Sequence, residues 1–120
     1  MINPKQQAFK KRLYDFVLRL IKFIENCKNS STTRIVGDQL LRSGTGILGT
    51  YIEGLAASSK KELTNYFNHS LKSANESKVW VCVLRDTENG DRAEANWLLK
   101  ELEEFSNIFA SSILTLKGKR

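Results

Sequence analysis

The sequence predicts an all-α protein, an antiparallel up-down-up-down four-helix bundle formed by a single domain over residues 1–120. Four segments repeat apolar residues at alternating spacings of three and four, the period of a helix that packs along one stripe. Short polar breaks separate these segments, and no stretch has the alternation of a strand. Helices of about 20 to 27 residues with short connections run antiparallel to their neighbours, which predicts a bundle roughly 35 Å long.

The first helix is expected to start after Pro4 and carries two apolar rows. One row is a heptad stripe that should face the core and consists of Phe9, Leu13, Phe16, Leu20, Phe23 and Cys27. The other row lies on a different side and consists of Tyr14, Leu18 and Ile21. Because apolar rows on the surface of a monomer are uncommon, we predict that this second row is a subunit contact. The alternative is a slightly apolar surface that faces solvent.

The second helix is predicted from about Thr33 to Ala56, after a polar break that offers N-cap residues. Each glycine inside a helix costs roughly 1 kcal/mol relative to alanine, so close packing has to offset this cost. We therefore place this helix at the centre of the bundle's contacts. Its apolar side contains Leu40, Leu41, Gly44, Ile47, Leu48, Tyr51 and Leu55, and its opposite side contains Arg42, Gly46, Gly49 and Glu53.

Arg42 and Glu53 bracket the glycine side of the second helix. They are eleven residues apart, about 16 Å along the helix, so they cannot pair with each other. We predict that each pairs across neighbouring helices or subunits, with Gly46 and Gly49 allowing the approach. The alternative is an intrachain bond from Arg42 or Glu53 to the first or third helix.

The third helix is expected to start at residues 59–62, where Ser-Lys-Lys-Glu has the pattern of a capping box. The middle of its stripe is small, which allows a close approach to the glycines of the second helix. This stripe consists of Leu63, Phe67, Ser70, Ala74, Ser77, Val81 and Leu84. A turn at residues 87–91 precedes the fourth helix, whose stripe consists of Ala95, Leu98, Leu102, Phe105, Phe109, Ser112 and Leu116.

Residues 44–49 spell G-x-G-x-x-G, the fingerprint of dinucleotide-binding folds. That fingerprint requires a preceding strand and a surrounding βαβ unit, whereas the residues before Gly44 continue a helical period. A phosphate loop would require Lys where Thr50 stands. We therefore predict that these glycines serve packing and do not bind a nucleotide.

Candidate catalytic and metal-ligating residues are few, and we predict a protein that is not an enzyme and has no metal or other cofactor. His69 is the only histidine, and it stands seven residues from both Glu62 and Glu76. A di-iron bundle would need Glu-x-x-His on two helices, and the sequence has neither. Cys27 and Cys82 are expected to be buried thiols in a reducing cytosol. No segment has the pattern of a membrane span or a secretion signal, so a cytoplasmic location is expected.

The formal charge of +6 is concentrated in the first helix and the C-terminal tail. Basic surfaces hold phosphates with strong salt dependence and little sequence preference. The alternative is a solvated face that only keeps the chain soluble, in which case the protein would be an interaction scaffold without a nucleic-acid ligand. The residues predicted to bind RNA or DNA are Lys10, Lys11, Arg12, Arg19, Lys22, Lys117, Lys119 and Arg120.

Several segments resemble the bacterial four helix bundle protein family, which includes the protein encoded in intervening sequences of 23S ribosomal RNA genes. The resemblance covers about residues 9–116. It rests on residues 41–45 (Leu-Arg-Ser-Gly-Thr), 53–54 (Glu-Gly), 59–62 (Ser-Lys-Lys-Glu), 74–77 (Ala-Asn-Glu-Ser) and Trp80. The sequence departs from the family at Gly46, Leu48 and Thr50, where Ser, Gly and Asn are usual.

The family is related in fold to the accessory variability determinant of diversity-generating retroelements. The resemblance therefore implies a ring-shaped homopentamer with a central channel and an association with nucleic acid. In the retroelement relatives it also implies contact with a reverse transcriptase. Together with the charge pattern, it predicts a non-enzymatic, homo-oligomeric accessory protein of RNA or DNA.

Overall fold

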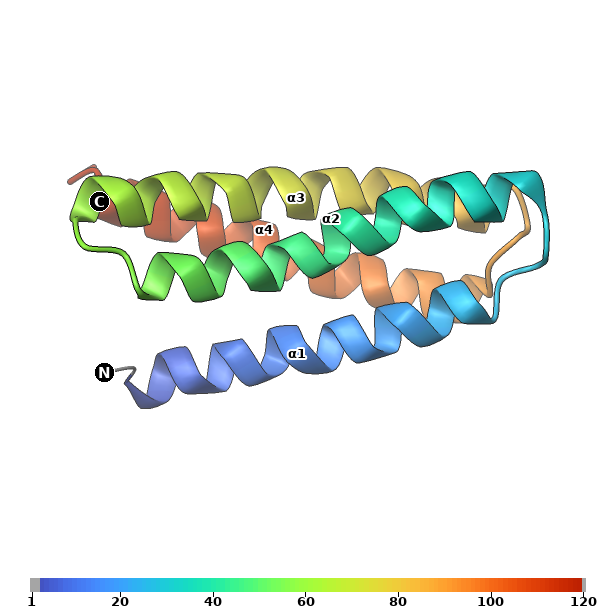
Figure 1. The fold of residues 1–120 in the computed structure, drawn as a ribbon, viewed down its shortest axis with the longest axis horizontal. Helices are drawn as coiled ribbons and strands as arrows, with labels where there is room; N and C mark the ends of the chain where they lie inside the picture. The colour runs from blue at the N-terminus through green and yellow to red at the C-terminus, as the bar shows by residue number, and fades with distance from the viewer. Residues whose placement is uncertain (1–2, 120) are drawn as a thin grey trace.

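A computed structural model describes residues 3–119 and confirms the predicted all-α four-helix bundle (Figure 1). The helices are α1 (Pro4–Glu25), α2 (Ser31–Leu55), α3 (Lys60–Asp86) and α4 (Arg92–Leu116), and the described residues contain no strand. The molecule measures 44 × 24 × 21 Å. It is longer than the sequence predicts because α3 alone, with 27 residues, spans about 40 Å before the end loops are added.

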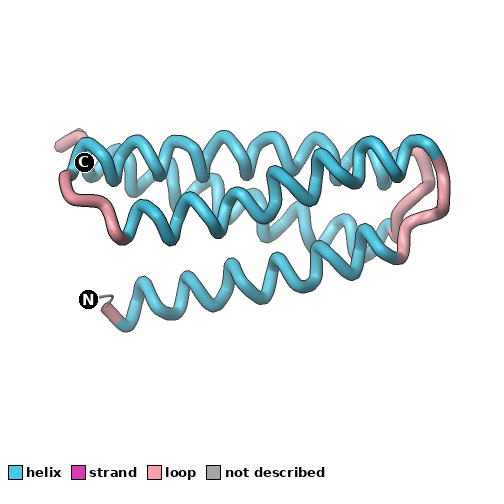
Figure 2. The backbone as a smooth tube through the Cα atoms, in the orientation of Figure 1, coloured by secondary structure: helices cyan, strands magenta, loops and turns pink. Residues whose placement is uncertain are grey.

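The helices alternate in direction, so their ends collect at opposite ends of the bundle (Figure 2). Both termini and the α2–α3 connection lie at one end, which we call the N/C end; the α1–α2 and α3–α4 connections lie at the other. The contact between α2 and α3 is the most extensive, and that between α1 and α4 is the smallest among neighbouring helices. As a result, α1 is the least enclosed helix of the bundle.

Polar side chains cap the helix starts. Asn3 forms a capping box with Gln6 ahead of Pro4, at the start of α1. Ser30 caps α2, which therefore begins two residues earlier than predicted. The capping box predicted at the start of α3 is only half formed: the Ser59 hydroxyl accepts the Glu62 amide at 3.1 Å, but the Glu62 carboxylate accepts the Ser58 hydroxyl instead of the Ser59 amide. A side-chain hydroxyl has replaced the backbone donor.

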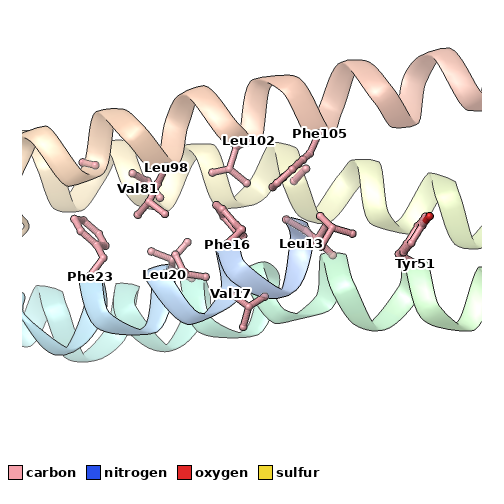
Figure 3. Packing of buried hydrophobic residues seen from close by; sticks show 14 of the residues in the cluster. Leu13, Phe16, Val17, Leu20, Phe23, Tyr51, Val81, Leu98, Leu102 and Phe105 are labelled. Carbon is pink, nitrogen blue, oxygen red and sulfur yellow. The ribbon is translucent and has the colours of Figure 1, made fainter. Parts of the chain in front are cut away.

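The core follows the predicted stripes (Figure 3). In the middle of the bundle, Phe16 of α1 meets Phe105 of α4 edge to face, with ring centres 5.2 Å apart. The largest difference from the prediction is Leu41, which was expected on the apolar side of α2 and is 39% exposed. The fully buried apolar side chains include Leu13, Leu20, Leu40, Ile47, Val81, Leu84, Leu98 and Leu102.

Small residues join α2 and α3, as predicted. The hydroxyls of Ser43 and Ser77 lie 2.7 Å apart, and those of Thr50 and Ser70 lie 2.6 Å apart. Between these pairs, a Cβ at Gly46 would lie 3.4 Å from the Ser73 hydroxyl oxygen. The two helices therefore approach closely without leaving a buried hydroxyl unpaired, which removes the main energetic cost of polar groups in a core.

Two glycines of α2 should respond in opposite ways to alanine. A Cβ at Gly44 would lie 2.1 Å from Cδ2 of Leu20, a fully buried side chain, whereas a Cβ at Gly49 meets nothing within 4 Å. We expect Gly44→Ala to lower the free energy of unfolding by about 1–2 kcal/mol, because overpacking exceeds the gain in helix propensity. Gly49→Ala should raise it by up to about 1 kcal/mol. Urea midpoints at one protein concentration test this order, and a stabilising Gly44→Ala would contradict it.

Candidate nucleic-acid interface

Several of the α1 cations predicted to bind phosphates already form ion pairs with carboxylates of this chain. Arg12 binds Glu101 through two hydrogen bonds of 2.6 and 3.1 Å, and Glu104 through a third of 3.0 Å. The guanidinium also lies over the ring of Phe105, 5.2 Å from its centre. The hydrogen bond with Glu101 is the main cause of the raised pKa of Arg12. This residue therefore ties α1 to α4 and offers little free charge to a phosphate.

Arg19 is occupied in the same way. Its side chain forms an ion pair with Glu94 and stacks on Trp97, with the guanidinium carbon 3.7 Å from the ring centre. The hydrogen bond with Glu94 raises the pKa of Arg19. Lys22 lies beside this pair, in a cavity of about 660 Å³ that Asp91 and Glu94 also line. A phosphate in this cavity would face both carboxylates.

The complementary acids of α4 were missed in the sequence, although a signal was present. Glu94, Glu101 and Glu104 recur at spacings of seven and three, which places them on one flank of a helix. Arg12 and Arg19 are also seven residues apart, so the two rows match in register. On α1 itself, Lys11 forms an ion pair of 2.9 Å with Asp15. Most cations on this flank of α1 are therefore paired with carboxylates and do not form a free basic surface.

Free cations gather instead at the N/C end. Of the predicted residues, Lys10, Lys22, Lys117 and Lys119 are exposed and form no ion pair within residues 3–119. Lys22 lies at the opposite end, in the cavity that Asp91 and Glu94 also line, and Arg120 lies outside the described residues. The fold brings further lysines to them, because α1 and α3 start where α2 and α4 end (Figure 1). The lysines in the outermost two turns and tails of this end are Lys5, Lys10, Lys60, Lys61, Lys117 and Lys119.

The two ends of the bundle differ in charge. Against the six lysines of the N/C end, the same turns contain only Glu53 and Glu62. The corresponding turns and loops at the opposite end contain six cations and five carboxylates. No ion pair joins the six lysines to a carboxylate within residues 3–119. Unpaired like charges at one end create a positive potential that attracts polyanions.

The residues predicted to contact another subunit form two surfaces. Tyr14 and Leu18 are 53% and 48% exposed, and Ile21 is half-buried. Tyr14 lines a groove with Leu48 and Ile52 of α2, and because the helices are antiparallel, Ile21 lies at the level of Leu41. We call this surface the α1–α2 face; it consists of Tyr14, Leu18, Ile21, Leu41, Leu48 and Ile52.

The second surface is the glycine side of α2. Arg42, Gly49 and Glu53 are exposed, whereas Gly46 packs on α3. Neither Arg42 nor Glu53 forms an ion pair or a side-chain hydrogen bond with any described residue. The intrachain alternative is therefore wrong for residues 3–119. Pairing between subunits stays a prediction.

The remaining residues considered for catalysis, metal binding or nucleotide binding have ordinary structural roles or lie exposed. The Glu76 carboxylate accepts the Trp80 indole N–H at 2.9 Å, and His69 is exposed. Within the described part of the chain, no three potential metal-ligating side chains come together. Residues 44–49 lie inside α2, away from any strand-to-helix turn. The two cysteines are free and half-buried rather than buried, and burial raises the pKa of the Cys27 thiol.

Comparison with known proteins identifies the family. The sequence profile described as 23S rRNA-intervening sequence protein matches residues 5–111. The chain belongs to the 23S rRNA-intervening sequence protein family. Its fold is also similar to a crystal structure from Bacteroides thetaiotaomicron, a protein with unknown function from the S23 ribosomal protein family. The two share 28% sequence identity and a TM-score of 0.80, covering 87% of this chain and 96% of that chain.

The family match places four of the six N/C-end lysines inside the shared sequence. Lys5, Lys10, Lys60 and Lys61 fall within residues 5–111 of the 23S rRNA-intervening sequence protein match, whereas Lys117 and Lys119 follow it. No curated protein matches the chain. Between residues 3 and 119, no helix combines the length and the hydropathy that crossing a membrane requires.

Proposed function

We propose that this chain is a non-enzymatic, homo-oligomeric accessory protein that holds RNA or DNA by its phosphates at the N/C end. The observation that carries the proposal is the excess of unpaired lysines there, six against two carboxylates, while the opposite end has six cations against five carboxylates. Lysines that neutralise phosphates release condensed counterions, so affinity should fall steeply as salt rises. Because the family is named after a sequence that interrupts 23S rRNA, ribosomal RNA is the first ligand to test.

Self-association would strengthen such binding. The α1–α2 face is apolar and uncovered, and Arg42 and Glu53 have no partner among the described residues, which together support a contact between copies. The number five comes from the family resemblance. In a ring of parallel subunits every N/C end would lie on one rim, so the lysines would act together on one polyanion. The resemblance to retroelement proteins extends the proposal to a reverse transcriptase as a protein partner of the ring.

The tail lysines provide a direct test. We expect Lys117→Glu with Lys119→Glu to weaken RNA binding about 10- to 100-fold at 0.1 M salt and to reduce the slope of log K against log salt by about 2. Fluorescence anisotropy with a labelled RNA hairpin, repeated from low to high salt, measures both quantities. Circular dichroism checks that the variant remains helical.

A control with the same change in charge separates a local surface from net charge. Lys28→Glu with Arg92→Glu alters two exposed cations at the opposite end. This variant should bind RNA within about threefold of the original protein if the N/C end is the phosphate site. Equal losses in both variants would contradict a local site. No salt-sensitive binding by the original protein would instead favour an interaction scaffold, for which the exposed α1–α2 face is the supporting observation.

A further inference from the structure

The N/C end contains a cavity as well as lysines. It has a volume of about 530 Å³, within the range of ~300–1,000 Å³ that is usual for ligand sites. Parts of α1, α2, α3 and α4 all line it. Its apolar lining includes Phe9, Tyr51, Phe67 and Phe109, and its polar lining includes Lys5 and Ser112. The fold thus joins an aromatic cavity to the basic end of the bundle.

The four rings form a wall in which two rings, those of Phe9 and Phe67, are partly accessible. Phe9 meets Tyr51 and Phe109 edge to face, with ring centres 5.1 and 5.6 Å apart, and Tyr51 stacks on Phe67. Tyr51 and Phe109 are buried, whereas Phe9 and Phe67 are half-buried. Tyr51 also lies at the end of the core, beyond the rings of Phe16 and Phe105 (Figure 3). A ligand in the cavity would therefore contact Phe9 and Phe67.

Polar groups beside these rings have hydrogen-bonding capacity that the described residues leave unused. The Tyr51 hydroxyl donates to the Gln6 carbonyl over a long 3.4 Å, and burial raises the pKa of Tyr51, so the hydroxyl stays protonated at neutral pH. Ser112 and Lys5 form no side-chain hydrogen bond or ion pair with a described residue. The cavity thus offers an aromatic wall, hydroxyl groups and a free cation. No carboxylate of a described residue lines it.

We propose that this cavity takes one unpaired nucleobase of a single strand, with the adjoining phosphates on Lys5 and the tail lysines. A nucleobase matches the lining because it is flat and aromatic and has hydrogen-bonding edges, and aromatic side chains hold such bases in many single-strand-binding proteins. A base inside a duplex has both faces stacked and cannot enter. The inference rests on the proposed binding of phosphates at the N/C end and narrows it to single-stranded nucleic acid.

Other cavities fit this ligand less well. The cavity beside Arg19 and Lys22 is lined by Asp91 and Glu94, which would repel phosphates. The groove containing Tyr14, Leu48 and Ile52 belongs to the apolar α1–α2 face and has no aromatic cluster. Of these three cavities, the one at the N/C end combines stacked rings with an unpaired lysine, Lys5.

The proposed base site is tested by a substitution whose large side chain would fill the cavity. Ser112→Trp introduces an indole at a half-buried lining position, and Asn107→Trp introduces the same side chain at an exposed position of α4 outside the lining. The probes are labelled decamers of uridine and of deoxythymidine, a blunt-ended duplex with a matched number of phosphates, and free uridine monophosphate. Anisotropy at 0.1 M salt gives the dissociation constants, and competition with the unlabelled monophosphate shows whether one nucleotide suffices.

We expect the original protein to bind the single strands about tenfold more tightly than the duplex, the factor typical of one stacked base. Ser112→Trp should lose this preference and keep duplex affinity, and Asn107→Trp should retain the preference. Phe9→Leu, which removes the ring and keeps an apolar side chain, should lower single-strand affinity about fivefold, and it serves as the test if Ser112→Trp does not fold.

The outcomes separate this inference from the proposed function. Equal affinity for the single strand and the duplex, unchanged by Ser112→Trp, would overturn the proposed base site and leave the proposed phosphate binding intact. This result is expected if the cavity instead holds an apolar side chain of a protein partner. Equal weakening of both probes by Ser112→Trp would also overturn it. Absence of any salt-sensitive binding by the original protein would refute the proposed function itself.

Discussion

Leu18→Asp is expected to dissociate the proposed homo-oligomer into single chains of 13.7 kDa. Leu18 is 48% exposed in the isolated chain, so an aspartate there should change the stability of the folded monomer by less than about 0.5 kcal/mol. In a contact between copies, however, the same carboxylate would be buried without a partner, which costs about 3–5 kcal/mol per interface. Light scattering after gel filtration, over a range of protein concentrations, measures the mass.

Val79→Asp is the matched control for this variant. Val79 is an exposed apolar residue on α3, away from the α1–α2 face, and its replacement should leave the mass unchanged. An original protein that is already monomeric would refute both the interface and the ring that the family resemblance implies. An oligomer that survives Leu18→Asp would move the contact to another surface, of which the side with Arg42 and Glu53 is the first candidate.

Phe105→Ala is expected to lower the free energy of unfolding by about 3–5 kcal/mol, the largest loss of stability within the folded chain among the changes considered. Phe105 is fully buried, and its ring meets those of Phe9 and Phe16 at centre distances of 5.8 and 5.2 Å. The Arg12 guanidinium also lies over this ring. Because α1 and α4 have the smallest contact among neighbouring helices, a large share of their attachment depends on this one side chain.

Urea unfolding followed by circular dichroism measures this loss as a change in midpoint at constant slope. The experiment is best made in the Leu18→Asp background, because dissociation of an oligomer would otherwise contribute to the apparent stability. Leu114→Ala, at an exposed position of α4, should change stability by less than about 0.5 kcal/mol. A loss below about 1 kcal/mol for Phe105→Ala would mean that α1 is attached mainly through α2.

The candidate site was predictable only in part. The sequence identified basic residues in the first helix and the tail, but it could not assign carboxylate partners to Arg12 and Arg19, because those pairs depend on how α1 packs against α4. Lys5, Lys60 and Lys61 were not predicted as members of the candidate site, although the alternating topology contains the necessary signal for the last two. Once α1 and α3 run in one direction, their first turns must lie beside the last turns of α2 and α4.

Sequence alone determined the features that depend on neighbouring residues along the chain. The period of the apolar residues, the N-cap residues and the polar breaks predicted four helices and nearly all of the core. Helices and their inward-facing sides depend on spacings of three and four and on local hydrogen bonds, which the sequence contains. The small centre of α3 also predicted its close approach to α2, which the Ser43–Ser77 and Thr50–Ser70 contacts confirm.

Only the tertiary structure decided which side chains meet across helices. A heptad stripe shows which side of a helix faces inward, but the axial level and crossing of each helix decide which rings and charges become neighbours. The aromatic cavity illustrates this, since Phe9, Tyr51, Phe67 and Phe109 come from four different helices. The charge difference between the two ends has the same origin, because folding brings helix ends that are distant in the sequence together at the same end of the bundle.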